Sequence, residues 1–252
     1  VSITVTPTMV SCHRLSDGKI QVTIAGGFPP FTVACTQVSE MQSMTVTNPN
    51  PGEYLIESLP ADTFMITITD ATFHAFPSRQ VIITQPDTLE ASFTSLINPA
   101  CHGISDGSVE FTITGGTPDY NITWDGGSSP GNIATHVGVG SHIFTITDSH
   151  GCIATVNDVP EIIEPDSIEI TDFTKIDLTC NGHPTGTINV TVIGGTAPYS
   201  YVIAGTVDDT TDNGVFNNLH AGTYTLSITD GNGCSAVVPQ NPIELTEPMP
   251  II

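Results

Sequence analysis

The chain has very little positive charge. Lys and Arg together number 4, against 26 Asp and Glu among 252 residues, which gives a formal net charge of -22. A nucleic acid or an anionic bilayer surface would be repelled by such a protein. We therefore expect no nucleic-acid partner.

Long apolar runs are also missing. No uninterrupted apolar segment is long enough to span a bilayer, and the first residues lack the basic and apolar regions of a signal peptide. We expect no direct membrane insertion, and we interpret the sequence as a mature chain or a slice of one.

Helical periodicity is almost absent. No stretch of ten or more residues keeps a helical apolar pattern free of Gly, Pro and β-branched runs, and only Thr36 to Met44 could form a helical turn. The 23 Gly and 19 Pro are spread through the chain, which is typical of short strands joined by turns.

Catalytic and zinc motifs are scarce. The eight His residues form no H-E-x-x-H, and no CxxC occurs. One G-x-S-x-G is present at Gly103 to Gly107, but a nucleophile elbow needs a following helix, and Ser108 to Thr114 reads as a strand. We expect no catalytic residue and no enzyme activity.

What the sequence does contain is one pattern repeated three times. Each copy has a cysteine, an Asp-Gly or Thr-Gly, a strand ending in Gly-Gly, an aromatic strand after Pro, and a Thr-rich strand ending in Thr-Asp. The period of about 80 to 90 residues matches a small Ig-like sandwich. We predict an all-β protein of three tandem Ig-like antiparallel β-sandwich domains in a linear rod, with boundaries at residues 1–86, 87–165 and 166–252.

Period-two alternation predicts the interior of each sandwich. The residues expected inside are Phe31, Val33 and Cys35 with Phe64, Ile66 and Ile68; Tyr120, Ile122 and Trp124 with His142, Phe144 and Ile146; and Tyr199, Tyr201 and Ile203 with Tyr224, Leu226 and Ile228.

Six cysteines, two in each copy, predict disulfides and an oxidising compartment. Alignment of the copies favours disulfides from Cys101 to Cys152 and from Cys180 to Cys234. Each would close a loop of about fifty residues and would stabilise the folded state by roughly 3 to 4 kcal/mol. The first copy has His74 in place of the second cysteine, so there we predict Cys12 with Cys35.

The combined motif resembles the SprB-type repeat of very large Bacteroidetes cell-surface proteins. Copies two and three carry it best, between Cys101 and Cys152 and between Cys180 and Cys234, including Gly115-Gly116-Thr117-Pro118 and Ala221-Gly222-Thr223-Tyr224; copy one lacks the Gly-Cys after Asp70. The resemblance implies a secreted, surface-anchored adhesin or filament built of many such domains. Because the tail Pro248 to Ile251 repeats the step Pro86 to Leu89, we expect the array to continue in the parent protein.

Oxygen ligands gather in several turns, as a hard cation such as Ca²⁺ requires. Asp-Gly is also ordinary turn chemistry, and no EF-hand loop is present, so the expected cofactor is none, with Ca²⁺ as the candidate. Its candidate ligands are Asp17, Asp70, Asp106, Asp148, Asp208, Asp209, Asp212, Asn213 and Asp230.

The two junctions between copies are short and stiffened by proline, at Gln85 to Leu89 and Glu164 to Ile168. Thr88 and Ser167 stand in an Asp-Thr/Ser-aliphatic sequence that looks like a Bacteroidetes O-glycosylation acceptor, although a linker turn explains the same residues.

We predict a structural and adhesive segment of an extracellular cell-surface filament or giant adhesin. Its expected partners are neighbouring domains or copies of the same protein, with surface glycans as candidates. The alternative is a glycan-binding accessory module of a secreted protein, which should show an exposed aromatic platform, yet the chain has a single Trp.

Overall fold

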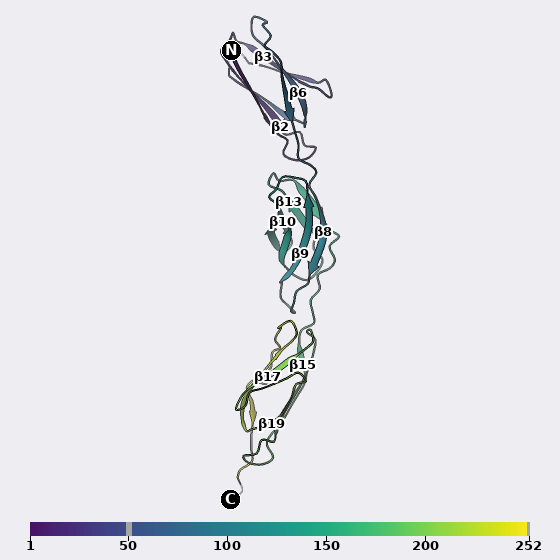
Figure 1. Cartoon of the computed structure of the whole chain (residues 1–252), viewed down its shortest axis with the longest axis vertical. Helices are drawn as coiled ribbons and strands as arrows, with labels where there is room; N and C mark the ends of the chain where they lie inside the picture. Colours follow the sequence, from purple (N-terminus) through teal and green to yellow (C-terminus); the bar gives the residue numbers. More distant parts are fainter. Residues whose placement is uncertain (49–51, 251–252) are drawn as a thin grey trace. The chain divides into compact units, whose positions relative to one another are not determined.

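The computed structural model describes residues 1–48 and 52–250, and within them every regular element is a β-strand (Figure 1). No membrane-spanning helix occurs in these two ranges. The strands form six antiparallel sheets, which confirms the predicted all-β fold of tandem sandwiches. Residues 251 and 252, which belong to the predicted third domain, lie outside the part of the chain that the structure describes.

Backbone contacts divide the chain into two compact units. The first comprises Val1–Thr94, Glu110–Ala134 and Ile143–Asp158, and the second comprises Ser95–Val109, Thr135–His142 and Val159–Ile252. The division runs through the second repeat, so the domain boundaries drawn from the sequence stay predictions.

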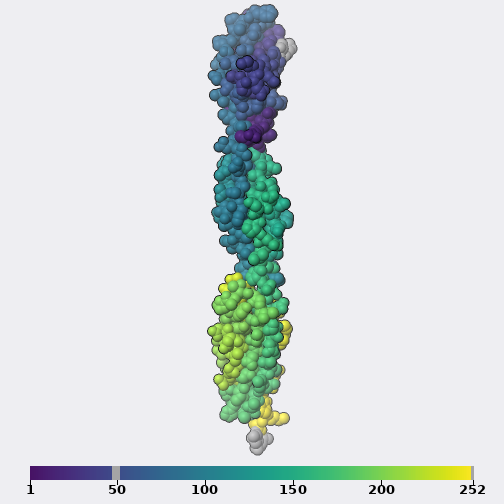
Figure 2. Space-filling view, turned by 90° about the vertical axis from the view of Figure 1, so that its right-hand side faces the viewer, coloured from purple at the N-terminus to yellow at the C-terminus, as the bar shows by residue number. Residues whose placement is uncertain are grey.

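The first repeat, within the first unit, is a sandwich of two sheets with strand orders β1-β2-β5 and β4-β3-β6-β7. Figure 2 shows its purple and blue segments packed against each other. The strands are β1 (Ser2–Thr8), β2 (Gly18–Ala25), β3 (Phe31–Gln37), β4 (Ser43–Asn48), β5 (Glu53–Leu59), β6 (Asp62–Thr69) and β7 (Arg79–Ile83).

The same seven-strand order occurs twice more, as β8-β9-β12 with β11-β10-β13-β14 and as β15-β16-β19 with β18-β17-β20-β21. The strands of the second set are β8 (Glu90–Ile97), β9 (Gly107–Thr114), β10 (Asn121–Trp124), β11 (Gly127–Pro130), β12 (Ile133–Val137), β13 (Phe144–Thr147) and β14 (Ile153–Val156). Those of the third are β15 (Glu169–Ile176), β16 (Gly186–Ile193), β17 (Ser200–Gly205), β18 (Asp209–Thr211), β19 (Val215–Leu219), β20 (Gly222–Thr229) and β21 (Ile243–Leu245).

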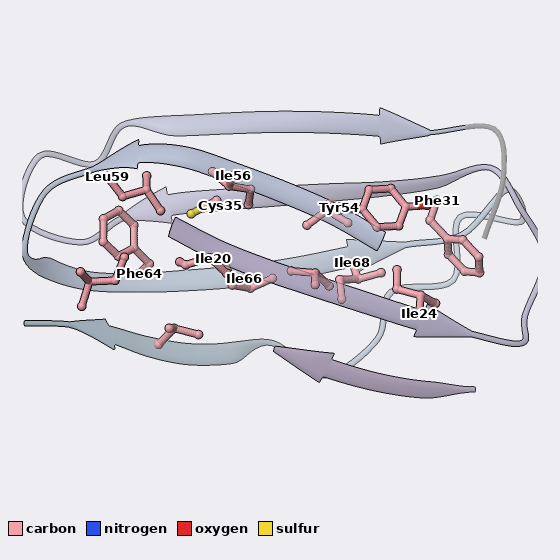
Figure 3. Packing of buried hydrophobic residues seen from close by; sticks show 14 of the residues in the cluster. Ile20, Ile24, Phe31, Cys35, Tyr54, Ile56, Leu59, Phe64, Ile66 and Ile68 are labelled. Atoms are coloured by element: carbon pink, nitrogen blue, oxygen red, sulfur yellow. The ribbon is translucent and has the colours of Figure 1, made fainter. Parts of the chain in front are cut away.

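Alternating side chains fill each sandwich as predicted. In β6, Phe64, Ile66 and Ile68 are buried, and Figure 3 shows them with residues of β2, β3 and β5 between the sheets. The third core is filled in the same way, with Tyr224, Leu226 and Ile228 buried in β20. Four residues expected inside are only half-buried: Tyr120, Trp124, His142 and Tyr199.

The expected helical turn at Thr36 to Met44 is wrong. Strand β3 continues to Gln37, a turn follows, and β4 begins at Ser43, with Thr36 opposite Ser43 in the antiparallel register. The segment is a hairpin because the strand pairing it makes with β3 satisfies its backbone groups.

The glycine of the Asp-Gly or Thr-Gly step has a packing role. A Cβ on Gly18 would lie 2.7 Å from the carbonyl oxygen of Leu59, and one on Gly107 would lie 2.7 Å from that of Val137. The facing strand bulges there in the first and third repeats. Ser58, His136 and Asn218 have positive φ at this place in the three repeats. Close approach of two backbones, rather than a tight turn, thus requires glycine.

Candidate functional site: the cysteine loops and the aspartate turns

The segment between the first two strands of each repeat, here called the cysteine loop, is residues 9–17, 98–106 and 177–185. An equivalent hydrogen bond closes each of the three loops. The backbone N–H of the residue before the cysteine donates to a side-chain oxygen of the residue before the glycine that begins the next strand. The pairs are Ser11 N to Asp17 Oδ1 at 3.0 Å, Ala100 N to Asp106 Oδ1 at 3.1 Å, and Thr179 N to Thr185 Oγ1 at 3.0 Å.

The end of the same repeat holds the loop from the other side. Two residues after each cysteine the backbone is left-handed, and its N–H donates to the Gln or Glu of the closing Gln-Pro or Glu-Pro step. The pairs are Arg14 N to Gln85 Oε1 at 2.7 Å, Gly103 N to Glu164 Oε2 at 2.6 Å, and Gly182 N to Glu247 Oε2 at 2.7 Å.

The second recurring element, here called the aspartate turn, is residues 70–74, 148–152 and 230–234. Asp230 is buried, and its carboxylate accepts from the backbone N–H groups of Asn232 at 2.9 Å, Cys234 at 2.8 Å and Thr196 at 2.8 Å. Burial alone would raise its pKa, but these donors outweigh burial and the pKa is lowered.

The other two turns share this arrangement. Asp148 accepts from the N–H groups of His150, Cys152 and Thr117 at 2.7 to 2.9 Å, and its pKa is lowered in the same way. The carboxylate of Asp70 accepts from Thr72 and His74, and the Thr72 hydroxyl is the main cause of its lowered pKa. The three carboxylates are therefore fixed anions that shape their own turns.

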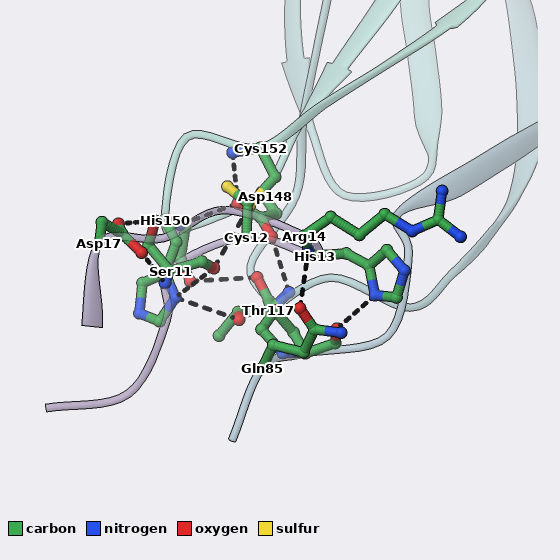
Figure 4. Close-up of a disulfide and its surroundings, with 12 residues drawn as sticks. Ser11, Cys12, His13, Arg14, Asp17, Gln85, Thr117, Asp148, His150 and Cys152 are labelled. Atoms are coloured by element: carbon green, nitrogen blue, oxygen red, sulfur yellow. Dashed lines mark hydrogen bonds between the residues drawn. A yellow bond between two sulfur atoms is a disulfide. The ribbon is translucent and has the colours of Figure 1, made fainter. Parts of the chain in front are cut away.

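Two disulfides join a cysteine loop to the aspartate turn of the next repeat. Cys12 is bonded to Cys152 in the first unit, and Cys101 is bonded to Cys234 in the second, with Cα atoms 5.7 and 5.6 Å apart. Figure 4 shows the first bond with Ser11, Thr117 and His150 around it. Each disulfide lies within a single compact unit.

All three predicted pairings are therefore wrong. In the third repeat, Cys180 precedes β16, whereas the turn of Cys234 is bonded to Thr196 beyond the end of β16. Eight strand residues separate the two ends by about 25 Å, far more than a disulfide spans. The predicted bond between Cys101 and Cys152 is wrong because each of these cysteines is bonded to a different partner.

The predicted bond from Cys12 to Cys35 fails differently. Cys35 lies within β3, where it faces the core and is 1% exposed. Burial raises the pKa of its thiol to about 11. Cys35 and Cys180 are the unpaired cysteines, and Cys180 is exposed.

A polar side chain accompanies each disulfide. His150 Nδ1 lies 3.3 Å from the carbonyl oxygen of Ser11, and the Nδ2 group of Asn232 donates to the carbonyl oxygen of Ala100 at 2.9 Å. These residues occupy the same position of the aspartate turn. Each disulfide therefore sits in a repeated polar contact between a loop and a turn.

The candidate Ca²⁺ ligands are dispersed and already hydrogen-bonded in part. Asp17 and Asp106 close cysteine loops, Asp208 accepts from Gly205 N–H, and Asp209 accepts from Thr210 N–H. Among residues 1–48 and 52–250, no group of three or more His, Cys, Asp or Glu is placed to hold a metal. Bound Ca²⁺ stays a prediction. The remaining candidates are Asp212, which is exposed, and Asn213, whose Oδ1 accepts from the N–H of Val215.

The other sequence candidates lie at or near the junctions. Thr88 is exposed, whereas Ser167 is half-buried and its hydroxyl donates to Glu169 at 3.4 Å; their glycosylation stays a prediction. Ser105 of the G-x-S-x-G sequence precedes strand β9 rather than a helix.

A hollow of about 660 Å³ lies beside the second disulfide, within the second unit. Its lining includes His102, Pro165, Ile168 and Asp230, but no Phe, Tyr or Trp. It therefore lacks the aromatic platform that the glycan-binding alternative predicts.

Sequence reasoning missed two sets of functional residues. The Gln or Glu of the closing step reads as part of a linker, although its recurrence before Pro at positions 85, 164 and 247 is a signal. His150 and Asn232 differ chemically and give no common signal, because only their place in the turn is shared.

Three segments of the chain match the SprB repeat, at residues 2–32, 94–129 and 173–207. Each match begins in the first strand of a repeat and runs through its cysteine loop and the paired glycines into the aromatic strand, which the second and third matches pass. The aspartate turns lie outside the matches. The resemblance to the SprB repeat seen in the sequence is thus confirmed in each of the three copies.

No curated protein sequence matches the chain. Among solved structures, it is similar to the three N-terminal domains of the Highly Immunogenic Outer Capsid protein (Hoc) of bacteriophage RB49, with 10% identity, 90% and 91% of the two chains covered and a TM-score of 0.41. It is also similar to a 1.5-MDa bacterial ice-binding adhesin, with 12% identity, 93% and 94% coverage and a TM-score of 0.37.

Proposed function

We propose that these SprB-type repeats form a structural and adhesive segment of an extracellular cell-surface adhesin, and that covalent coupling of consecutive repeats is central to this role. The observation that carries the proposal is that the first and second cysteine loops are each joined by a disulfide to the aspartate turn of the following repeat. A cross-link at this place restricts motion between repeats rather than stabilising a single core.

Composition supports an extracellular, cell-surface location. Disulfides persist in oxidising environments outside the cytosol. A net charge of -22 keeps neighbouring molecules apart in solution. Both features suit a chain that is exposed at high local density on a cell surface.

We expect the segment to have no catalytic activity. Its buried carboxylates at positions 70, 148 and 230 are occupied by hydrogen bonds to their own turns. The expected partners are neighbouring repeats or copies of the parent protein, and surface glycans remain candidates for the adhesive contact.

The location is tested by immunogold labelling of intact source cells with antibodies raised against the folded chain. Labelling on the outer surface, removed by brief protease treatment of whole cells, is the expected result. Label that requires permeabilised cells would contradict the proposal. A glycan array probed with the oxidised chain tests the glycan-binding alternative, which binding of a defined glycan would support.

Coupling is tested by small-angle X-ray scattering of the wild-type chain and the Cys12→Ser/Cys101→Ser variant. We expect the variant to show a broader distribution of intramolecular distances because its junctions retain only non-covalent contacts. Identical scattering curves would show that the disulfides do not restrict the repeats.

A further inference from the structure

The third cysteine loop is built like the two that carry disulfides. Thr179 N–H donates to Thr185, and Gly182 N–H donates to Glu247, as in the equivalent bonds of the first two loops. Asn181 Nδ2 donates to Pro248 O at 3.0 Å, and His13 Nδ1 lies 3.2 Å from Pro86 O at the same place in the first loop. Yet Cys180 is exposed and unpaired.

The two matching loops show what binds there. At both, the occupant is the last residue of an aspartate turn, Cys152 or Cys234, from the repeat that follows in the chain. The side chain two residues earlier in the turn contacts the carbonyl group that precedes the loop cysteine. That carbonyl belongs to Thr179 in the third loop.

Another copy of this chain has no suitable turn to offer. Cys152 and Cys234 are already bonded, and the first aspartate turn ends in His74. The occupant must therefore be a further repeat that brings its own cysteine.

We propose that the cysteine loop at residues 177–185 is a docking surface for the Asp-x-x-Gly-Cys turn of a further SprB-type repeat joined C-terminally, and that Cys180 forms a disulfide with that turn. The inference rests on the bridged junctions and is independent of the cell-surface location.

The bond forms by oxidation of two thiols. The thiols of Cys180 and of the incoming turn lose two electrons and two protons in total, and Cys180 attacks as its thiolate after giving up the first of these protons. A low-molecular-weight disulfide such as oxidised glutathione accepts them through a mixed disulfide and leaves as two thiols. The product is one new S–S bond.

The first test extends the full chain by a fourth repeat. Residues 168–250 are fused directly after Pro250, which keeps the spacing of the natural junctions, and the terminal copy of Cys180 is replaced by Ser. After oxidation with glutathione, disulfide mapping by mass spectrometry should find Cys180 bonded to the appended copy of Cys234. A retained bond between Cys101 and Cys234 verifies that the original repeats are folded.

Native thiol titration gives a second readout. Cys35 is buried with a raised pKa and should not react, so the wild-type chain has about one reactive thiol and the extended chain should have nearly none. Cys180 left free beside a free appended cysteine, or Cys180 bonded to Cys180 of a second molecule, would overturn the proposal.

A second variant covers the case in which the appended repeat does not fold. His74→Cys places a thiol in the first aspartate turn, where the His74 backbone N–H bonds to Asp70 and is unchanged by the substitution. Oxidised H74C should form a ladder of covalent oligomers on non-reducing gels, through Cys180 of one molecule and position 74 of another. H74C/C180S should remain monomeric. Oligomers of equal abundance in both variants, or in neither, would contradict docking at this loop.

Discussion

The first and third repeats have the same strand order but place their cysteines differently. In the first, Cys35 is buried in the core and the aspartate turn ends in His74; in the third, the turn ends in Cys234 and the loop cysteine is unpaired. Neither sandwich has a disulfide between its own two sheets among the described residues. The comparison teaches that the apolar core specifies the fold, while the bonded cysteines couple one repeat to the next.

Removing the first disulfide should have the largest effect on stability. The bond joins residues 140 apart, and the loop-entropy relation gives about 5 kcal/mol for such a loop. We expect Cys12→Ser/Cys152→Ser to lower the free energy of unfolding by up to about this amount in guanidinium titration. Cys180→Ser, at an exposed unpaired site, should change it by less than about 0.5 kcal/mol. Equal stability of all three proteins would show that the bond does not constrain the unfolded chain.

Truncating equivalent core residues should affect the two repeats alike. Phe64 in β6 and Tyr224 in β20 are 1% and 0% exposed. Because each is fully buried between the two sheets of its sandwich, we expect Phe64→Ala and Tyr224→Ala each to cost about 3 to 5 kcal/mol in the free energy of unfolding, measured by thermal or chemical denaturation. The matched surface variants Thr67→Ala and Thr225→Ala should be nearly neutral. A large loss in one repeat alone would break the equivalence of the two cores.

The aspartate turns should make stability fall in acid. The native pKa of Asp230 lies below the value of about 3.9 in an unfolded chain, so its stabilisation is complete above pH 4 and is lost as the pH falls through the native pKa.

Replacing the carboxylate of Asp230 tests how much of this acid dependence comes from its turn. Asp230→Asn should cost about 1.5 to 3 kcal/mol at pH 7, because it weakens hydrogen bonds to a charged acceptor, and it should flatten the acid dependence of Tm measured by calorimetry. The exposed Asp212→Asn is the control and should leave that dependence unchanged. If Tm fell in acid as steeply in Asp230→Asn as in the wild-type chain, other carboxylates would be responsible for the acid dependence.

The glycines at the start of the second strand, Gly18 in the first repeat and Gly186 in the third, should give a smaller difference in stability between the two repeats. An added Cβ would lie 2.7 Å from Leu59 O at Gly18 but 3.0 Å from Leu219 O at Gly186. Gly18→Ala should therefore destabilise more than Gly186→Ala, both toward the lower end of about 1 to 3 kcal/mol. The measurement is guanidinium denaturation of the two variants beside the wild-type chain. The reverse order would show that the facing bulge relaxes freely.

Much of the fold could be predicted because it depends on local patterns. Alternation in β6 and β20 identified the buried face, and the recurring Gly-Gly marked the strand ends, where Gly115 and Gly194 have positive φ. The half-buried Trp124 shows the limit, since its position alternates correctly but lies at the last residue of a short strand.

The disulfides could not be predicted in the same way. An alignment of the repeats shows which positions are equivalent. It cannot distinguish a bond from Cys152 to a cysteine of its own copy from a bond to Cys12 of the preceding copy. Two signals were present in the sequence: the first copy lacks a turn cysteine, and an eight-residue strand separates the loop from the turn of its own copy. Both indicate pairing between successive copies.

The two disulfides close overlapping rings, since residues 101–152 belong to both. The shortest covalent path from end to end therefore runs only through residues 1–12, 101–152 and 234–252, about one third of the chain. Under tension, a fully unravelled oxidised chain would reach roughly 300 Å, whereas a reduced one would reach roughly 900 Å. The arrangement sets a covalent limit on stretch that stays in force after every β-sheet has been pulled apart.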